Sequence, residues 1–157
     1  MNSELYTNIA NGYAYRISRD ENAQLILINA DLFPDLLELA LNLDDKNHYK
    51  ACWILELVLE KQINFVTDHL PVFSFSLSKF TNESALRSIS KICLFLIQHL
   101  ILSNLQEDQI TESRFEWLIN GDRKVAKKAY AIRALFELGK KNDWIHPELQ
   151  RILSDDY

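Results

Sequence analysis

The sequence predicts an all-α fold made of stacked helical hairpins, and three observations support this fold class. An apolar stripe with helical spacing occurs three times, following Asp44, Asn82 and Asp122 in the same register. The three starting points are separated by 38 and 40 residues, a spacing that is typical of helical repeat arrays. The chain of 157 residues contains only three Gly and three Pro, so the helices must be joined by short connections.

Each stripe predicts the second helix of a hairpin, with one face buried against its neighbours. Asp44, Asn82 and Asp122 are predicted N-caps, because a side-chain oxygen at that position accepts a hydrogen bond from the first helical turn. The stripe residues are Ala51, Ile54, Leu57 and Val58 in the first copy, Ile89, Ile92, Phe95 and Leu96 in the second, and Ala129, Ile132, Leu135 and Phe136 in the third.

The three prolines locate the shorter first helices, since proline is favoured in the first helical turn. Pro34, Pro71 and Pro147 are separated by 37 and 76 residues, or one repeat and two. We therefore expect one domain over residues 1–157, with capping helices in 1–30 and a C-terminal helix at 147–155. The predicted helix pairs span 32–63 (32–43 with 45–63), 68–103 (68–79 with 82–103) and 110–141 (110–120 with 122–141).

With these caps and prolines, residues 32–157 resemble the HEAT-like, armadillo-type family of α-superhelical repeat proteins. The resemblance implies a right-handed α-α superhelix of about three HEAT-like helical hairpins plus terminal helices. It also implies that the second helices line a ligand-facing side, as in a partner-binding module. The third copy lacks the proline and is the least regular.

The composition and the net charge of the chain disfavour some classes of partner and cofactor. A net charge of −5 disfavours nucleic acid and anionic lipid as partners. Cys52 and Cys93 lie among apolar residues on predicted helices, which indicates buried, reduced thiols in a cytoplasmic protein. His48 and Cys52 share one helix face after Asp44, as two ligands of a metal site would. The favoured explanation is instead that Asp44 caps the helix, His48 lies in its first turn and Cys52 packs in the core. We expect no metal and no cofactor.

Catalytic motifs are missing from the sequence. It contains no glycine-rich phosphate loop, no G-x-S-x-G, no H-E-x-x-H and no paired C-x-x-C. An enzyme is therefore the least favoured reading. Some small bacterial chains of HEAT-like appearance bear the label adenylosuccinate lyase, but such lyases are far longer and carry a serine-rich signature loop that this chain lacks.

The favoured function is a non-enzymatic adaptor or scaffold that binds an unidentified protein or peptide on the face of its second helices. The face predicted for the first of these helices combines aromatic and acidic residues, and that of the next is basic, a composition that suits a protein-binding surface. The candidate residues are Tyr49, Trp53, Glu56, Glu60, Arg87 and Lys91. The register continues through Leu94 and Gln98, and then through Lys127, Ala131, Ala134 and Leu138. Alternatively, Trp53 fills the core between hairpins while the glutamates pair with Arg87 and Lys91.

A basic patch on the third second helix supports the alternative function, nucleic-acid binding. Arg123, Lys124, Lys127 and Lys128 form this patch, and the three lysines share one helix face. The competing explanation is an ordinary solvated surface, since no aromatic stacking platform accompanies the patch.

Overall fold

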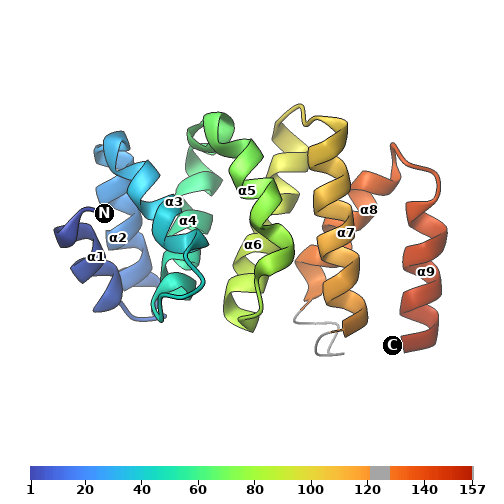
Figure 1. Ribbon diagram of the computed structural model, residues 1–157, viewed down its shortest axis with the longest axis horizontal. Coiled ribbons are helices and arrows are strands. Elements are labelled where there is room, and N and C mark those ends of the chain that lie inside the picture. The colour runs from blue at the N-terminus through green and yellow to red at the C-terminus, as the bar shows by residue number, and fades with distance from the viewer. Residues whose placement is uncertain (121–127, 157) are drawn as a thin grey trace.

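The computed structural model describes residues 1–120 and 128–156, and this part of the chain is all-α and 82% helical, without strands. Figure 1 shows the helices following one another from one end of an elongated molecule to the other, with the two termini at opposite ends. The nine described α-helices are α1 (Ser3–Ala10), α2 (Arg16–Ile28), α3 (Phe33–Leu41), α4 (His48–Lys61), α5 (Leu70–Ser76), α6 (Glu83–His99), α7 (Asn104–Asn120), α8 (Ala129–Gly139) and α9 (Ile145–Asp156). Three short 3₁₀ helices are η1 (Ala30–Leu32), η2 (Ile63–His69) and η3 (Leu77–Lys79).

Helices α2, α4, α6 and α8 pack against one another in that order. On the other side, α3 packs on α4, and α7 contacts α5, η3, α8 and α9. In Figure 1, α8 lies behind α7, so these two helices present opposite faces of the molecule. The side chains of α4, α6 and α8 can therefore meet on one face, while those of α7 and α9 meet on another.

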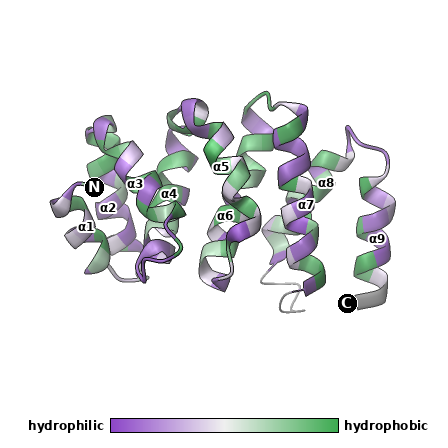
Figure 2. Ribbon diagram, in the orientation of Figure 1, coloured by the Kyte–Doolittle hydropathy of each residue, from purple (hydrophilic) through white to green (hydrophobic). Residues whose placement is uncertain are grey.

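One continuous apolar core runs through the described residues, from Leu5 in α1 to Ile152 in α9. Ile92 and Leu96 of α6 are fully buried at its centre, and both thiols, Cys52 and Cys93, are free and buried. Figure 2 shows long hydrophobic stretches on α4, whereas α9 alternates between hydrophobic and hydrophilic turns. Among the described helices, none has both the length and the hydropathy needed to cross a membrane.

The predicted N-caps have different outcomes. Asn82 caps α6, and its side chain accepts a hydrogen bond from the Ala85 amide at 3.0 Å, as predicted. Asp44 is not an N-cap, because α4 begins only at His48. Asp45 instead accepts the Asn47 amide at 2.8 Å and the Tyr6 hydroxyl at 3.3 Å, so a turn held by α1 occupies the expected first helical turn.

Helix α7 begins six residues before the predicted 110, and α6 correspondingly ends at His99 rather than at 103. The cause is a reciprocal pair of hydrogen bonds at the start of α7. The Gln106 amide donates to the Ser103 hydroxyl at 3.1 Å, and the Ser103 amide donates to the Gln106 side chain at 3.0 Å. This is a capping box of the S-x-x-Q type, which satisfies two otherwise unpaired donors.

The prolines occupy the first turns of α3, α5 and α9, as predicted. The predicted helix at 68–79 is shorter and is flanked by 3₁₀ segments, so only Leu70–Ser76 is α-helical. The predicted cap Asp122 lies outside the described residues, which resume at Lys128 immediately before α8. Helices α3, α5 and α7 begin at Phe33, Leu70 and Asn104, at intervals of 37 and 34 residues.

Candidate functional site

The six candidate residues from the sequence lie on two helices that pack together, α4 and α6. Tyr49 and Trp53 are half-buried, Glu60 and Arg87 are exposed, and Lys91 is half-buried. Glu56 is buried, with 4% of its surface exposed. The structure therefore places most of these residues on one surface, but the carboxylate of Glu56 is buried beneath that surface.

Tyr49 and Trp53 form the aromatic end of this surface. Their ring centroids are 5.1 Å apart with planes at 83°, an edge-to-face geometry that aromatic pairs favour. The indole nitrogen of Trp53 donates to the Ser84 hydroxyl at 2.7 Å, which joins α4 to the start of α6. Trp53 thus combines a partly exposed ring with a structural hydrogen bond between helices.

The Glu56 carboxylate connects α4 to α6 further along. Its Oε2 lies 3.3 Å from Lys91 Nζ, and its Oε1 lies 3.9 Å from Arg87 Nη1. The side chain of Arg87 remains 50% exposed and that of Lys91 18% exposed. The sequence left open that Glu56 and Glu60 pair with Arg87 and Lys91, and Glu56 does pair with both cations. Glu60 forms no ion pair within the described residues.

Tyr130 of α8 extends the surface to a third helix and was missed from the sequence. Arg87 Cζ and Lys91 Nζ lie 5.3 Å and 5.4 Å from the centre of its ring, within range of cation–π attraction. Arg133, three residues further along α8, is exposed beside it. We define the cationic–aromatic strip as Tyr49, Trp53, Arg87, Lys91 and Tyr130.

The predicted register on the third helix was wrong at the positions that the structure describes. Ala131, Ala134 and Leu138 are buried, with at most 1% of their surface exposed, so they face the core. On α6, Leu94 is also buried. The alignment from Asp122 placed the outward face of α8 about one residue too far along the helix. The prediction therefore did not include Tyr130 among the surface residues.

The basic patch is only partly described. Arg123, Lys124 and Lys127 lie outside the described residues. Lys128 is fully buried, and its Nζ donates to the Trp117 carbonyl at 3.1 Å. Lys128 is therefore an interior cation that joins α7 to α8, and it does not contribute to a surface patch.

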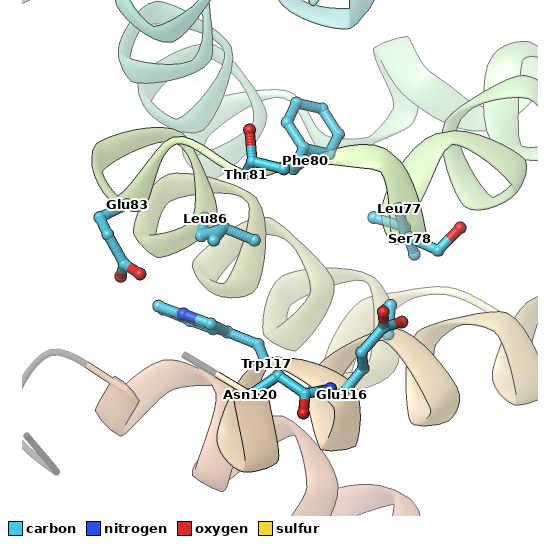
Figure 3. Close-up of a pocket in the computed structure, with 10 residues that line it drawn as sticks. Leu77, Ser78, Phe80, Thr81, Glu83, Leu86, Glu116, Trp117 and Asn120 are labelled. Carbon is cyan, nitrogen blue, oxygen red and sulfur yellow. The ribbon is translucent and has the colours of Figure 1, made fainter. Parts of the chain in front are cut away.

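A hollow of about 250 Å³ lies between η3, the start of α6 and the second half of α7 (Figure 3). Phe80, Leu86 and Trp117 supply apolar walls, and Glu83 and Glu116 flank the space in this view. The Trp117 indole nitrogen is buried and has no hydrogen-bond partner in the described part of the chain. The hollow suits a few water molecules or one small side chain.

A buried guanidinium lies between α7 and α6. Arg114 is fully buried, donates through Nε to Ser113 Oγ at 3.3 Å, and donates through Nη1 to the Ser90 hydroxyl of α6. Burial lowers the pKa of Arg114, while the nearby Cys93 thiol acts in the opposite direction. Its contacts join α7 to α6, and it lines none of the hollows described here.

The titratable groups that could support catalysis are separated or shielded. Burial raises the pKa of the Cys52 thiol far above its usual range and that of Cys93 to about 11, so neither is a thiolate near neutral pH. Cys52 Sγ is 3.6 Å from the Ala40 carbonyl, and burial lowers the pKa of His48. Among the described residues, no group of three or more His, Cys, Asp or Glu is arranged to hold a metal ion.

Comparison with known proteins adds no family to this geometry. No protein-family model matches the chain, and neither a curated protein nor a solved structure matches it.

Proposed function

We propose that this protein is a non-enzymatic helical-repeat adaptor of the HEAT-like, armadillo type, and that its cationic–aromatic strip binds an acidic segment of a partner protein. The observation that carries the proposal is the meeting of Tyr49, Trp53, Arg87, Lys91 and Tyr130 from three separate helices on one face. Tyrosine, tryptophan and arginine are the residues most enriched where binding energy concentrates in protein interfaces.

The helical-repeat part of the proposal has its own support. The first helices α3, α5 and α7 begin at intervals close to the length of one such repeat. The second helices α4, α6 and α8 each pack on the next, which is the neighbour-to-neighbour packing typical of solenoids. A right-handed superhelical course of these hairpins is part of what we propose.

The charge of the strip indicates the chemistry of the partner. Glu56 is buried beneath Lys91 and leaves Arg87 half exposed, and the exposed Arg133 lies beside Tyr130. The exposed carboxylate closest to the strip along α4 is Glu60, four residues after Glu56. An acidic segment with an aromatic or aliphatic side chain would pair with the cations and cover the half-buried rings.

Nucleic acid remains the weaker alternative. Burial of Lys128 removes one cation from the patch on which that alternative rested. The strip and the neighbouring Arg133 together offer only two well-exposed arginines, Arg87 and Arg133, fewer than the six to ten phosphate contacts of a strongly salt-dependent nucleic-acid binder.

The test is affinity capture from lysate of the source cell with chemical cross-linking, comparing charge-neutralised variants. Arg87→Gln with Arg133→Gln removes the exposed arginine of the strip and the exposed arginine beside it without truncating Trp53, whose hydrogen bond to Ser84 supports the fold. The matched control is Lys46→Gln with Lys79→Gln, two exposed lysines outside the strip.

We expect wild type and control to capture the same protein, cross-linked through an acidic segment, and the strip variant to retain it about tenfold less. Equal retention by the strip variant would place the binding surface elsewhere. Absence of any captured protein would contradict the adaptor function, and loss of capture after nuclease treatment would favour nucleic acid.

A further inference from the structure

A second surface of opposite character lies between α7 and α9, beside the hollow in Figure 3, with which it shares Glu116 and Asn120 of α7. It is a groove of about 820 Å³ with an apolar floor and a charged rim. Phe115, Ile119, Trp144 and Pro147 supply the apolar part. Ile119 of α7 is 50% exposed and Trp144, in the turn before α9, is 57% exposed, although both are large apolar side chains.

The apolar floor is built from both helices. The rings of Phe115 and Trp144 lie 5.7 Å apart at 30°, so the exposed indole is supported by a phenyl ring that is almost entirely buried. An exposed aromatic ring that is held by a buried one is typical of sites at which a partner protein places an apolar side chain.

The wall formed by α7 is acidic. Glu112 and Glu116 line the groove, and Asp108 precedes Glu112 by the same interval of four residues, just beyond the lining, so three exposed carboxylates lie in one row along the helix. None of the three forms an ion pair within the described part of the chain. Like charges at this spacing destabilise a helix, and a row of cations opposite them would relieve the repulsion.

The wall formed by α9 is neutralised internally. Arg151 Nη2 lies 2.7 Å from Glu148 Oε1, and this hydrogen bond lowers the pKa of the Glu148 carboxyl. The net charge that an occupant meets at the rim is therefore set by the row on α7.

We propose that the α7–α9 groove binds an amphipathic helical segment of a partner protein that carries a row of Lys or Arg beside large apolar side chains. The dimensions agree with this occupant: carboxylates eight residues apart span about 12 Å of helix, and cations at i, i+4 and i+8 of a partner helix span the same length. A second copy of this chain fits less well, because no described helix carries three cations at that spacing. With the cationic–aromatic strip on the opposite side, the protein would hold an acidic and a basic partner together.

The test is selection from a phage-displayed library of helical peptides on the wild-type protein, followed by affinity measurement of the selected peptides. We expect enrichment of Lys or Arg at four-residue spacing beside large apolar residues. Binding should fall about tenfold for Glu112→Lys with Glu116→Lys, because two favourable charge pairs become unfavourable. The control Glu21→Lys with Glu38→Lys makes the same charge change at exposed sites outside the groove.

Two further arms separate the groove from general electrostatics. A peptide with its cations replaced by Glu should bind the Glu112→Lys, Glu116→Lys variant better than it binds wild type. Trp144→Ala should weaken the selected peptides while the circular dichroism spectrum stays helical. The proposal is overturned if the selected peptides lack cations or if the library yields no binder. It is also overturned if peptide affinity is unchanged by the charge reversal or by Trp144→Ala, or if light scattering shows self-association through this groove.

Discussion

Gly139 and His146 are in such close contact that no other residue fits at position 139 without moving the histidine. A Cβ placed on Gly139 would lie 2.0 Å from Cδ2 of His146 and 2.3 Å from its Nε2. The same ring stacks on Phe136 at 4.8 Å, and its Nε2 lies 2.8 Å from the Phe136 carbonyl. Gly139 is the last residue of α8, so this contact sets how closely α9 returns onto α8.

We predict that Gly139→Ala destabilises the protein by about 1–3 kcal/mol, because the added methyl group must displace the His146 ring. In a His146→Ala background the same substitution should become neutral or stabilising, since alanine is preferred over glycine in a helix by up to about 1 kcal/mol. Urea unfolding of the two single variants and the double variant measures this coupling. Equal effects of Gly139→Ala in both backgrounds would show that the close contact is not what requires glycine.

The two described residues that the sequence identified as caps should respond differently to substitution. Asn82→Ala should cost about 1 kcal/mol, because it removes the acceptor of the Ala85 amide at the start of α6. Asp44→Ala should change stability by less than about 0.5 kcal/mol, because Asp44 is exposed and caps no helix. Chemical denaturation of both variants tests this contrast, and similar losses for the two would contradict the assigned start of α4.

The helix content and the central helices could be read from the sequence because local signals agree there. The apolar stripe through Ile92, the cap at Asn82 and the prolines all depend on residues within one or two turns. The capping box of Ser103 and Gln106 was also readable, and its omission shortened α7 in the prediction.

The parts that could not be read depend on tertiary contacts. Asp44 has the right residue type for a cap, but Tyr6 from α1 stabilises a turn at Asp45 instead. Lys128 belongs to a basic run, yet its amine points inward to a carbonyl of α7. The strip was predicted on α4 and α6 but not on α8, because the position of Tyr130 follows from helix packing rather than from the spacing of Asp44, Asn82 and Asp122.

The Glu56–Lys91 pair should show strong coupling. Lys91→Met leaves the buried Glu56 carboxylate with Arg87 as its remaining cation, at 3.9 Å, and should cost about 2 kcal/mol. Glu56→Gln combined with Lys91→Met should recover most of this loss, since a neutral amide is less costly to bury than an unpaired charge. A double-mutant cycle measured by urea unfolding gives the coupling, and additive single effects would mean that the pair contributes nothing specific.

His48 should make the stability of the protein depend on pH. The side chain is 7% exposed, its ring lies near those of Tyr49 and Phe80, and its Nδ1 has no hydrogen-bond partner within the described residues. Burial lowers the pKa of His48 below its usual 6.5, against smaller opposing effects of a hydrogen bond with the Ala40 backbone and of the Asp45 charge. The unfolded chain therefore binds a proton near pH 6.5 that the folded protein does not yet accept.

The free energy of unfolding should accordingly be highest above pH 6.5 and fall as the pH drops through that value toward 5. His48→Gln should lower stability at pH 8 but flatten this dependence, because glutamine does not titrate. His99→Gln, at an exposed histidine on α6, is the control and should leave the slope unchanged. The measurement is urea unfolding at several pH values. An equal slope for wild type and His48→Gln would show that burial of this imidazole does not control the acid sensitivity.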